Sequence, residues 1–246
     1  MFHLSGDPAD LGKRGDRAAL IGDNANRERD QWIGLALNAP IHCDKCTARE
    51  VFGGIERVAF GVPACGDALA DRVGVGGFRD GDEVIALRPS YAKYRFYAEV
   101  AGAKIIEIDY KTPALAFPLN DLLAAITPRT RAILIANPNN PTGTAINLAG
   151  IEQILKSAPH AAVLIDEAYY EFFGVTALNL LWKYPQLFVS RTFSKVFGMA
   201  AMRLGCLFSH EANVAYLHKA QSPYSVNSVA VLAAQAALEA RQYIET

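Results

Sequence analysis

One lysine stands in a segment whose side chains could act on a carbonyl compound. Lys195 lies among aromatic residues such as Phe193, and apolar neighbours disfavour a charged amine, so we expect a partly desolvated nucleophile. The same segment carries groups that suit a phosphate: the hydroxyls of Thr192 and Ser194, and Arg203 eight residues after the lysine. An amine next to a phosphate-binding group predicts a site for pyridoxal 5'-phosphate, a cofactor whose aldehyde reacts with amines.

Two upstream segments supply groups that this cofactor needs around its ring. Asp166 ends the apolar run at 162–165, and a carboxylate there can keep the ring nitrogen protonated. Asn140 lies in a turn-like segment at 137–143, and Tyr169 comes three residues after the aspartate. Both side chains could hydrogen-bond the phenolic oxygen of the ring and stabilise its anion.

Each of these residues also has a simpler interpretation. A lysine in a loop rich in Ser and Thr is commonly a solvated surface charge. Asp166 could cap a helix, Tyr169 could be a core aromatic residue, and the Asn, Pro and Gly around Asn140 are typical of a turn. Because the segments occur together and in order, we favour a cofactor site.

Three sequence strings carry a resemblance to a known family. They are NPNNPTG at 137–143, LIDEAYYEF at 164–172 and RTFSKVFGMAAMRLG at 191–205. In this order they resemble the fold-type I aminotransferases of class I and II, which use pyridoxal phosphate, and most closely the histidinol-phosphate aminotransferases. The resemblance covers 77–246 and implies that Tyr91 stacks on the ring of the cofactor.

The resemblance also implies a reaction. A small-molecule amino donor and a keto-acid acceptor would be the substrates, with histidinol phosphate and 2-oxoglutarate as the expected pair. The freed amine of Lys195 would then move the proton at the substrate Cα. Two alternatives are another reaction on the same scaffold, such as threonine-phosphate decarboxylation or aromatic transamination, and a catalytically impaired remnant. The family further implies a homodimer.

The pattern of apolar runs predicts an α/β fold, a three-layer, mainly parallel sheet flanked by helices. We expect strands at 83–87, 104–108, 131–136, 161–165, 187–190 and 203–208. Helices are expected at 90–102, at 120–126 with Asn120 as its cap, and at 147–157, 211–221 and 228–246. The motifs then fall at strand ends, where open α/β sheets bind ligands.

We expect two regions along the chain. Residues 77–246 correspond to an incomplete cofactor-binding large domain, and residues 1–76 form a divergent, poorly patterned segment. A phosphate-binding turn would fall near Gly66 and Asp67, although the sequence match there is poor. The small C-terminal domain that carries the family's substrate-binding arginine is missing, so we expect a truncated member.

Composition excludes several classes of partner. The formal net charge of −1 gives no electrostatic reason to expect nucleic acid. Apolar runs are of strand length, so we expect no membrane span, and no secretory signal is visible, which favours a cytoplasmic protein. Cys43 and Cys46 have metal-ligand spacing but lack a second pair, so reduced thiols and no metal site are expected.

Overall fold

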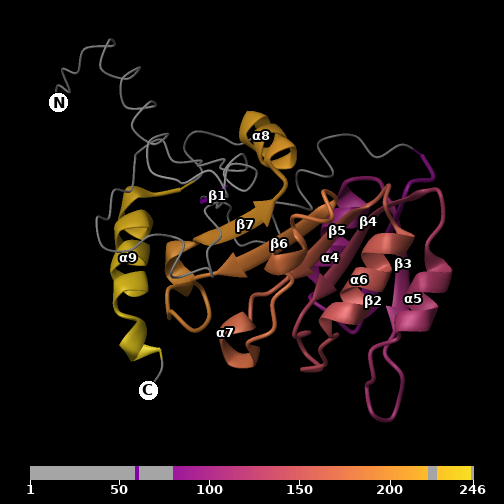
Figure 1. The fold of residues 1–246 in the computed structure, drawn as a ribbon, viewed down its shortest axis with the longest axis horizontal. Coiled ribbons are helices and arrows are strands. Elements are labelled where there is room, and N and C mark those ends of the chain that lie inside the picture. Colours follow the sequence, from indigo (N-terminus) through magenta and orange to yellow (C-terminus); the bar gives the residue numbers. More distant parts are fainter. Residues whose placement is uncertain (1–58, 61–79, 221–225, 245–246) are drawn as a thin grey trace, which may run out of the picture.

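The computed structural model describes residues 59–60, 80–220 and 226–244 (Figure 1). The expectations for Cys43, Cys46, Gly66 and Asp67 lie outside these residues. Among the helices described, none combines the length and the apolar character needed to cross a bilayer.

The strands of the described residues form one sheet in the order β1-β7-β6-β5-β4-β2-β3. They are β1 (Ala59–Phe60), β2 (Glu83–Arg88), β3 (Lys104–Asp109), β4 (Thr130–Ala136), β5 (Ala162–Asp166), β6 (Leu187–Thr192) and β7 (Gly205–Ser209). From β2 to β6 the neighbouring strands are parallel, whereas β7 is antiparallel to β6 and β1 is antiparallel to β7. The expectation of a mainly parallel sheet is therefore confirmed.

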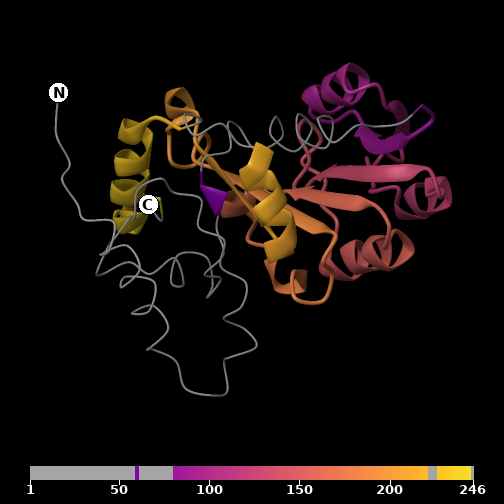
Figure 2. The same cartoon turned by 90° about the horizontal axis from the view of Figure 1, so that it is seen from above.

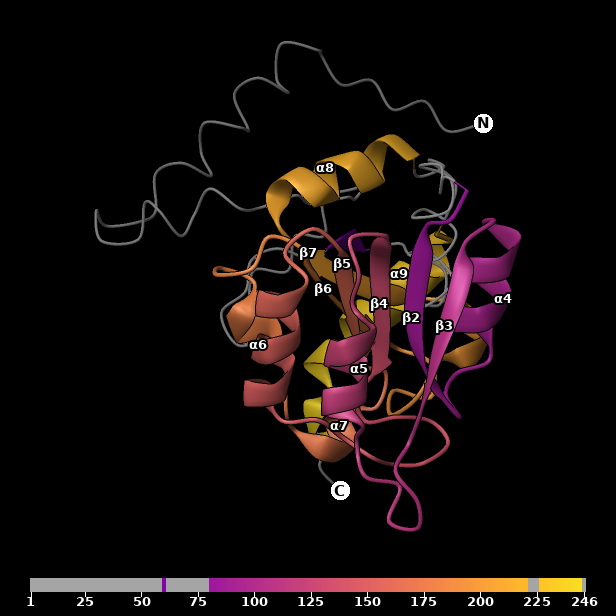
Figure 3. The ribbon, with the colours of Figure 1, turned by 90° about the vertical axis from the view of Figure 1, so that its right-hand side faces the viewer.

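Helices lie on both faces of this sheet. They are α4 (Lys93–Val100), α5 (Leu119–Ala125), α6 (Leu148–Ser157), α7 (Tyr170–Phe173), α8 (Glu211–Ala220) and α9 (Ser228–Glu239), with 3-10 turns η2 (Leu178–Leu180), η3 (Ala200–Met202) and η4 (Arg241–Tyr243). Figure 2 shows α4 on one side of the sheet and α6 on the other. In Figure 3 α5 and α6 lie side by side. The arrangement has the three expected layers.

Alternation along the strands divides the core between the two faces. In β4, Ile133 and Ile135 are fully buried against residues of α5, α6 and α9. The intervening Ala132 and Leu134 face the opposite layer, where they pack with residues of α4 and with Leu217 of α8. Because both faces are covered, the inner strands β4 and β5 contain continuous apolar runs, which are typical of parallel sheets.

The starts of two helices differ from the expected ones. The helix expected at 147–157 begins at Leu148, and Asn147 is its N-cap, since its side chain accepts a hydrogen bond from the backbone N–H of Gly150 at 2.9 Å. The expectation that Asn120 caps α5 is wrong, because the helix already includes Leu119 and its N-cap is Pro118. A capping side chain must precede the first turn, whereas Asn120 lies inside it.

Boundaries near the predicted site also differ from the sequence pattern. The helix expected at 90–102 is the shorter α4, and positive φ at Gly102 (79°) follows its end. The strand β6 runs on to Thr192, two residues beyond the expected end at Ser190. Arg203 precedes β7 and adopts a left-handed backbone (φ 56°), which takes it out of the expected strand.

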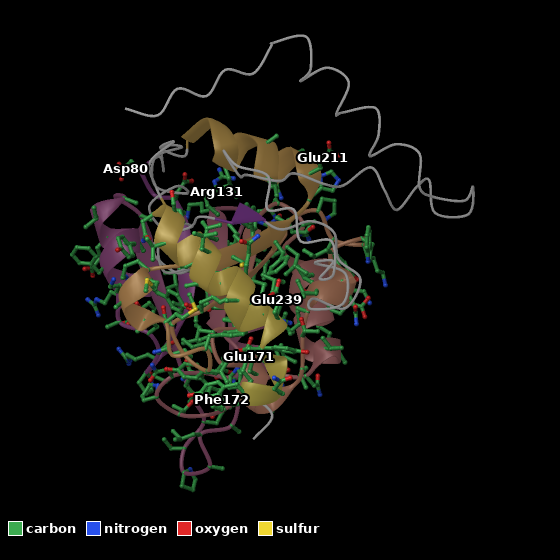
Figure 4. The ribbon with its side chains drawn as sticks, turned by 90° about the vertical axis from the view of Figure 1, so that its left-hand side faces the viewer. Asp80, Arg131, Glu171, Phe172, Glu211 and Glu239 are labelled. Atoms are coloured by element: carbon green, nitrogen blue, oxygen red, sulfur yellow. The ribbon has the colours of Figure 1, made fainter. Side chains whose placement is uncertain are left out.

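The sheet brings the sequence motifs to a single edge. Asp166, the last residue of β5, is paired in register with Ala136 of β4 and Ser190 of β6. In Figure 4, Arg131 at the start of β4 lies at the opposite edge from Glu171 and Phe172, which follow β5. The three loops that carry the motifs therefore begin side by side, at the carboxyl ends of the strands.

Candidate active site

One pocket of about 200 Å³ collects the residues singled out from the sequence. All eight of the expected cofactor-contacting residues line it: Tyr91, Asn140, Asp166, Tyr169, Thr192, Ser194, Lys195 and Arg203. The remaining lining residues are small or lack charge: Ala136, Pro138, Ala168 and Ala200. Positions spread over more than a hundred residues thus meet in one cavity. Their chemical roles stay predictions.

Lys195 enters the pocket over an aromatic face. Its Nζ lies 5.2 Å from the centroid of the Tyr169 ring, within the range of a cation–π contact. The expectation of a partly desolvated lysine is wrong for this structure, because Lys195 is exposed. The aromatic neighbours turn away from it: Phe193 is 2% exposed and packs on Phe197, with ring centroids 4.9 Å apart.

Asp166 is the buried acid of the pocket, with 7% exposure. Its Oδ1 accepts hydrogen bonds from the Ser190 hydroxyl at 2.9 Å and the Ala168 backbone N–H at 3.1 Å. Its Oδ2 accepts one from the Tyr94 hydroxyl at 2.7 Å. Burial raises the pKa of Asp166, and these hydrogen bonds oppose the increase. Asp166 does not cap a helix, because α7 starts at Tyr170 after the N-cap Tyr169.

The two groups expected beside the phenolic oxygen of the cofactor lie next to one another. The Asn140 amide donates to the Tyr169 hydroxyl at 3.3 Å, which joins the loop after β4 to the loop after β5. Asn140 is exposed and Tyr169 is half-buried, so both polar groups are open to the cavity. An oxygen anion between them could accept from both.

Tyr91 lies on the side of the pocket formed by the loop after β2. Its ring packs edge-on against the ring of Tyr94, with centroids 5.5 Å apart and planes at 84°. This geometry is typical of aromatic pairs and fixes the orientation of the Tyr91 ring. The packing interpretation and the stacking interpretation are therefore compatible, since Tyr91 packs against Tyr94 and also lines the cavity.

The groups expected to hold phosphate fit an anion that accepts hydrogen bonds. The Ser194 Oγ is buried and has no hydrogen-bond partner among the residues that the structure describes, although it lines the cavity. A buried hydroxyl without a partner is costly unless a ligand satisfies it. Thr192 Oγ1 accepts from the Ser194 backbone N–H at 3.1 Å, and Arg203 donates to the Ala200 carbonyl at 2.8 Å. Donors of this type suit the cofactor phosphate.

Sequence reasoning missed the residues that support the pocket from behind. Tyr94 and Ser190 hold Asp166, and the sequence carries a signal for Ser190 alone. Tyr94 lies in the first turn of α4, and no local pattern indicates that its hydroxyl reaches Asp166. Ser190 ends the apolar run of the neighbouring parallel strand, where register aligns it with Asp166.

Asn139 is a third missed residue, and it ties two loops together. Its amide donates to the Pro89 carbonyl at 3.0 Å and to the Thr142 hydroxyl at 2.8 Å. Its carbonyl oxygen accepts from Ser90 at 2.7 Å. Because Asn139 is 3% exposed, these bonds are shielded from water, and they fix the loop that carries Asn140 beside the loop that carries Tyr91.

A second buried acid follows Asp166 directly. Glu167 is fully buried and forms an ion pair with Arg191, with Nη2 and Oε2 3.0 Å apart. Thr176 and the Ala177 backbone N–H also donate to its carboxylate, at 2.8 and 2.6 Å. The Arg191 guanidinium lies 3.4 Å from the centroid of the Tyr170 ring. Neither Glu167 nor Arg191 lines the pocket.

Comparison with known proteins identifies the family to which the chain belongs. A family model described as aminotransferase class I and II matches residues 55–246. The chain therefore belongs to the class I and II aminotransferases, the pyridoxal-phosphate-dependent family that the three sequence strings resemble.

Within this family, the chain is similar to histidinol-phosphate aminotransferases. The chain is 41% identical over 164 residues to a histidinol-phosphate aminotransferase of Dehalococcoides mccartyi, covering 67% of this chain and 45% of that protein. It is 37% identical over 169 residues to the protein of that name from Lactiplantibacillus plantarum, covering 67% and 47%. The chain thus spans about half the length of the curated relatives it matches.

Solved structures have the same fold. The histidinol-phosphate aminotransferase of Clostridium acetobutylicum superposes with a TM-score of 0.70 at 24% identity, covering 81% of this chain and 59% of that one. The Sinorhizobium meliloti enzyme, in complex with pyridoxal-5'-phosphate, gives a TM-score of 0.72 at 22% identity, covering 81% and 55%. At these identities the likeness establishes the fold, which is the aminotransferase large domain.

Proposed function

We propose that the chain binds pyridoxal 5'-phosphate in this pocket and supports transamination of an amino-acid-like substrate. One observation carries the proposal: a single cavity contains an amine, a buried acid and a buried hydroxyl that has no partner among the described residues, on Lys195, Asp166 and Ser194. These are the groups that the aldehyde, the ring nitrogen and the phosphate of the cofactor require.

The pocket residues divide the binding of the cofactor among them. When bound, pyridoxal phosphate supplies an aldehyde that condenses with amines and a protonated ring that accepts electrons. Asp166 would accept the N–H of the ring nitrogen and so keep it protonated. Ser194, Thr192 and Arg203 would bind the phosphate, and Tyr91 would cover one face of the ring.

Lys195 would have two roles in this scheme. Its amine would attach the cofactor, and once a substrate amine replaces it, the free amine would move the proton at the substrate Cα. Asn140 and Tyr169 would hold the phenolic oxygen of the ring as an anion. The position of Nζ over the Tyr169 ring supports these roles, because it places the amine beside a side chain expected to hold the phenolic oxygen.

The proposed substrates are histidinol phosphate, which is in line with the names of the relatives, and 2-oxoglutarate, which the sequence resemblance implies as the acceptor. A homodimer, which the same resemblance implies, and a cytoplasmic location belong to the same proposal. The whole reaction requires groups that bind the substrate carboxylate or phosphate, and the relatives are about twice as long as the matched segment.

Reductive trapping tests cofactor binding. We expect borohydride treatment of the chain with pyridoxal phosphate to fix the cofactor on Lys195, as located by peptide mass mapping. Lys195→Ala should abolish this label, whereas Lys183→Ala, which alters an exposed lysine at the surface ion pair with Glu152, should leave it unchanged. Label scattered over surface lysines would refute the proposed site.

The substrate is tested by the spectrum of the loaded chain. Histidinol phosphate should convert the aldehyde form of the cofactor to its amine form, and 2-oxoglutarate should reverse the change. Conversion by phenylalanine, or release of carbon dioxide from threonine phosphate, would instead indicate one of the alternative reactions. Absence of any conversion in a chain that traps the cofactor would favour the impaired remnant.

A further inference from the structure

Tyr94 lies behind the pocket and contacts its buried acid. The side chain is 1% exposed, is not among the residues that line the cavity, and reaches Asp166 from a position 72 residues earlier in the chain. Its hydroxyl donates to Asp166 Oδ2 at 2.7 Å, the shortest of the three hydrogen bonds to that carboxylate. Tyr94 therefore acts on the acid without contacting a ligand.

The three donors are unevenly shared between the two carboxylate oxygens. Oδ1 accepts from Ser190 and from the Ala168 backbone, whereas Oδ2 accepts from Tyr94. Each carboxylate oxygen can accept about two hydrogen bonds. Within the described residues Oδ2 is thus the oxygen with capacity for one more donor, and Tyr94 fixes its direction.

Burial makes this hydrogen bond important for the charge of the acid. An acid removed from water favours its neutral form unless donors stabilise the anion. Tyr94 and Ser190 are the two side chains that donate to Asp166, and both are buried themselves. A neutral Asp166 would lose the negative charge that attracts a protonated ring nitrogen.

The position of Tyr94 links two walls of the site. It lies in the first turn of α4, three residues after Tyr91, and its ring packs edge-on against that of Tyr91. The start of one helix thereby sets both the aromatic side chain expected over the cofactor and the donor to the acid expected at its nitrogen.

We propose that Tyr94 is a positioning residue, which orients the Asp166 carboxylate and stabilises its anion so that Oδ2 accepts the ring N–H of the cofactor. This inference rests on the proposed binding of pyridoxal phosphate. It adds a residue that neither lines the pocket nor reacts, yet controls how strongly the pocket holds the cofactor.

The test is the affinity of the full chain for pyridoxal phosphate in Tyr94→Phe. This change keeps the ring that packs on Tyr91 and removes the hydroxyl, so we expect native circular dichroism and a Kd raised about tenfold. The pH below which binding weakens should move upward, because Asp166 then ionises less readily. Tyr97→Phe, a matched change on the same helix, should alter neither quantity.

A double-mutant cycle separates positioning from general structure. If Tyr94 acts through Asp166, then Tyr94→Phe should have little further effect on Kd in an Asp166→Asn background. An equal tenfold loss in both backgrounds would overturn the inference. An unchanged Kd in the single variant would overturn it too, while trapping on Lys195 in the wild-type chain would leave the proposed function standing. Failure of wild-type trapping at Lys195 would overturn both.

Discussion

Two adjacent acids at the end of β5 are both buried but have different hydrogen-bond partners. Asp166 faces the pocket and receives its hydrogen bonds from two hydroxyls and one backbone N–H. Glu167 faces away from it and pairs with the Arg191 guanidinium, which also lies over the Tyr170 ring. One acid has a cation as a direct partner and the other, among the described residues, has neutral donors alone.

The difference indicates that Glu167 stabilises the fold, whereas Asp166 is available to a ligand in the pocket. Burial raises the pKa of both acids, and Arg191 opposes this for Glu167 by direct pairing. At Asp166 the hydrogen bonds from Tyr94, Ser190 and the Ala168 backbone oppose it, and Lys195 contributes through space without an ion pair among the described residues. The charge of a carboxylate that accepts from neutral donors is available to a cationic ligand, whereas the charge of Glu167 is already paired with Arg191.

The largest effect should come from breaking the paired acid. Arg191→Leu would leave Glu167 buried without its cation, and we expect a loss of about 3–5 kcal/mol in the free energy of unfolding. Urea denaturation measures this change. Arg95→Leu, which removes an exposed arginine paired with Glu99 and Glu107, should change stability little. An equal loss in the free energy of unfolding of the two variants would contradict the view that the buried ion pair matters more than the exposed one.

An intermediate effect is expected from exchanging each acid for its amide. Asp166→Asn should weaken binding of pyridoxal phosphate by roughly 10- to 100-fold, the range of a hydrogen bond to a charged group, with little loss of stability. Glu167→Gln should do the reverse, since it leaves Arg191 unpaired but does not alter the cavity lining. Calorimetric titration and urea denaturation distinguish the two. An equal loss of pyridoxal phosphate binding in the two variants would contradict the different roles assigned to the two acids.

The smallest effect is a difference in pH dependence of the cofactor-free chain. The folded-state pKa of Asp166 is raised above its unfolded value of 3.8, so the folded state holds its proton more tightly. Stability therefore falls as the pH rises from about that value through the folded pKa. Asp166→Asn should remove the part of this pH-dependent loss of stability that Asp166 causes. The free energy of unfolding of the variant should therefore rise relative to that of the wild type as the pH rises above 3.8. A difference in the free energy of unfolding that does not change with pH would contradict a raised pKa for Asp166.

The half-buried surface acid Glu152 gives a control of opposite sign. Lys183 and Tyr184 lower the pKa of Glu152 from 4.5 to about 2. Its contribution to stability is present above 4.5 and is lost as the pH falls towards 2. Glu152→Gln should therefore be less stable than the wild type above 4.5, with the difference closing as the pH falls, whereas Asp166→Asn should gain stability relative to the wild type as the pH rises above 3.8.

Much of the fold could be predicted because the strands are buried on both faces. The apolar runs that contain Ile133 and Val163 are typical of strands buried on both faces of a sheet. Neighbouring parallel strands have their carboxyl ends at the same edge of the sheet. That alignment brings the motifs of Asn140, Asp166 and Lys195 into one cavity. The pocket membership of all eight residues follows from it.

What the sequence did not reveal depends on side-chain direction and on distant partners. Lys195 was expected among apolar groups, yet Phe193 turns into the core and the lysine turns out. Tyr94 reaches Asp166 only because α4 packs on β2 and β3, which places a helix start over the end of β5. Local patterns do not encode such contacts between elements far apart in sequence.

The most direct test is a crystal structure of the chain with pyridoxal phosphate reduced onto it by borohydride. The account predicts attachment at Lys195, a ring nitrogen within hydrogen-bond distance of Asp166 Oδ2, and a phosphate against Ser194 and Arg203. Attachment at another lysine, or a ring nitrogen directed away from Asp166, would contradict the central claim that this pocket is a cofactor site.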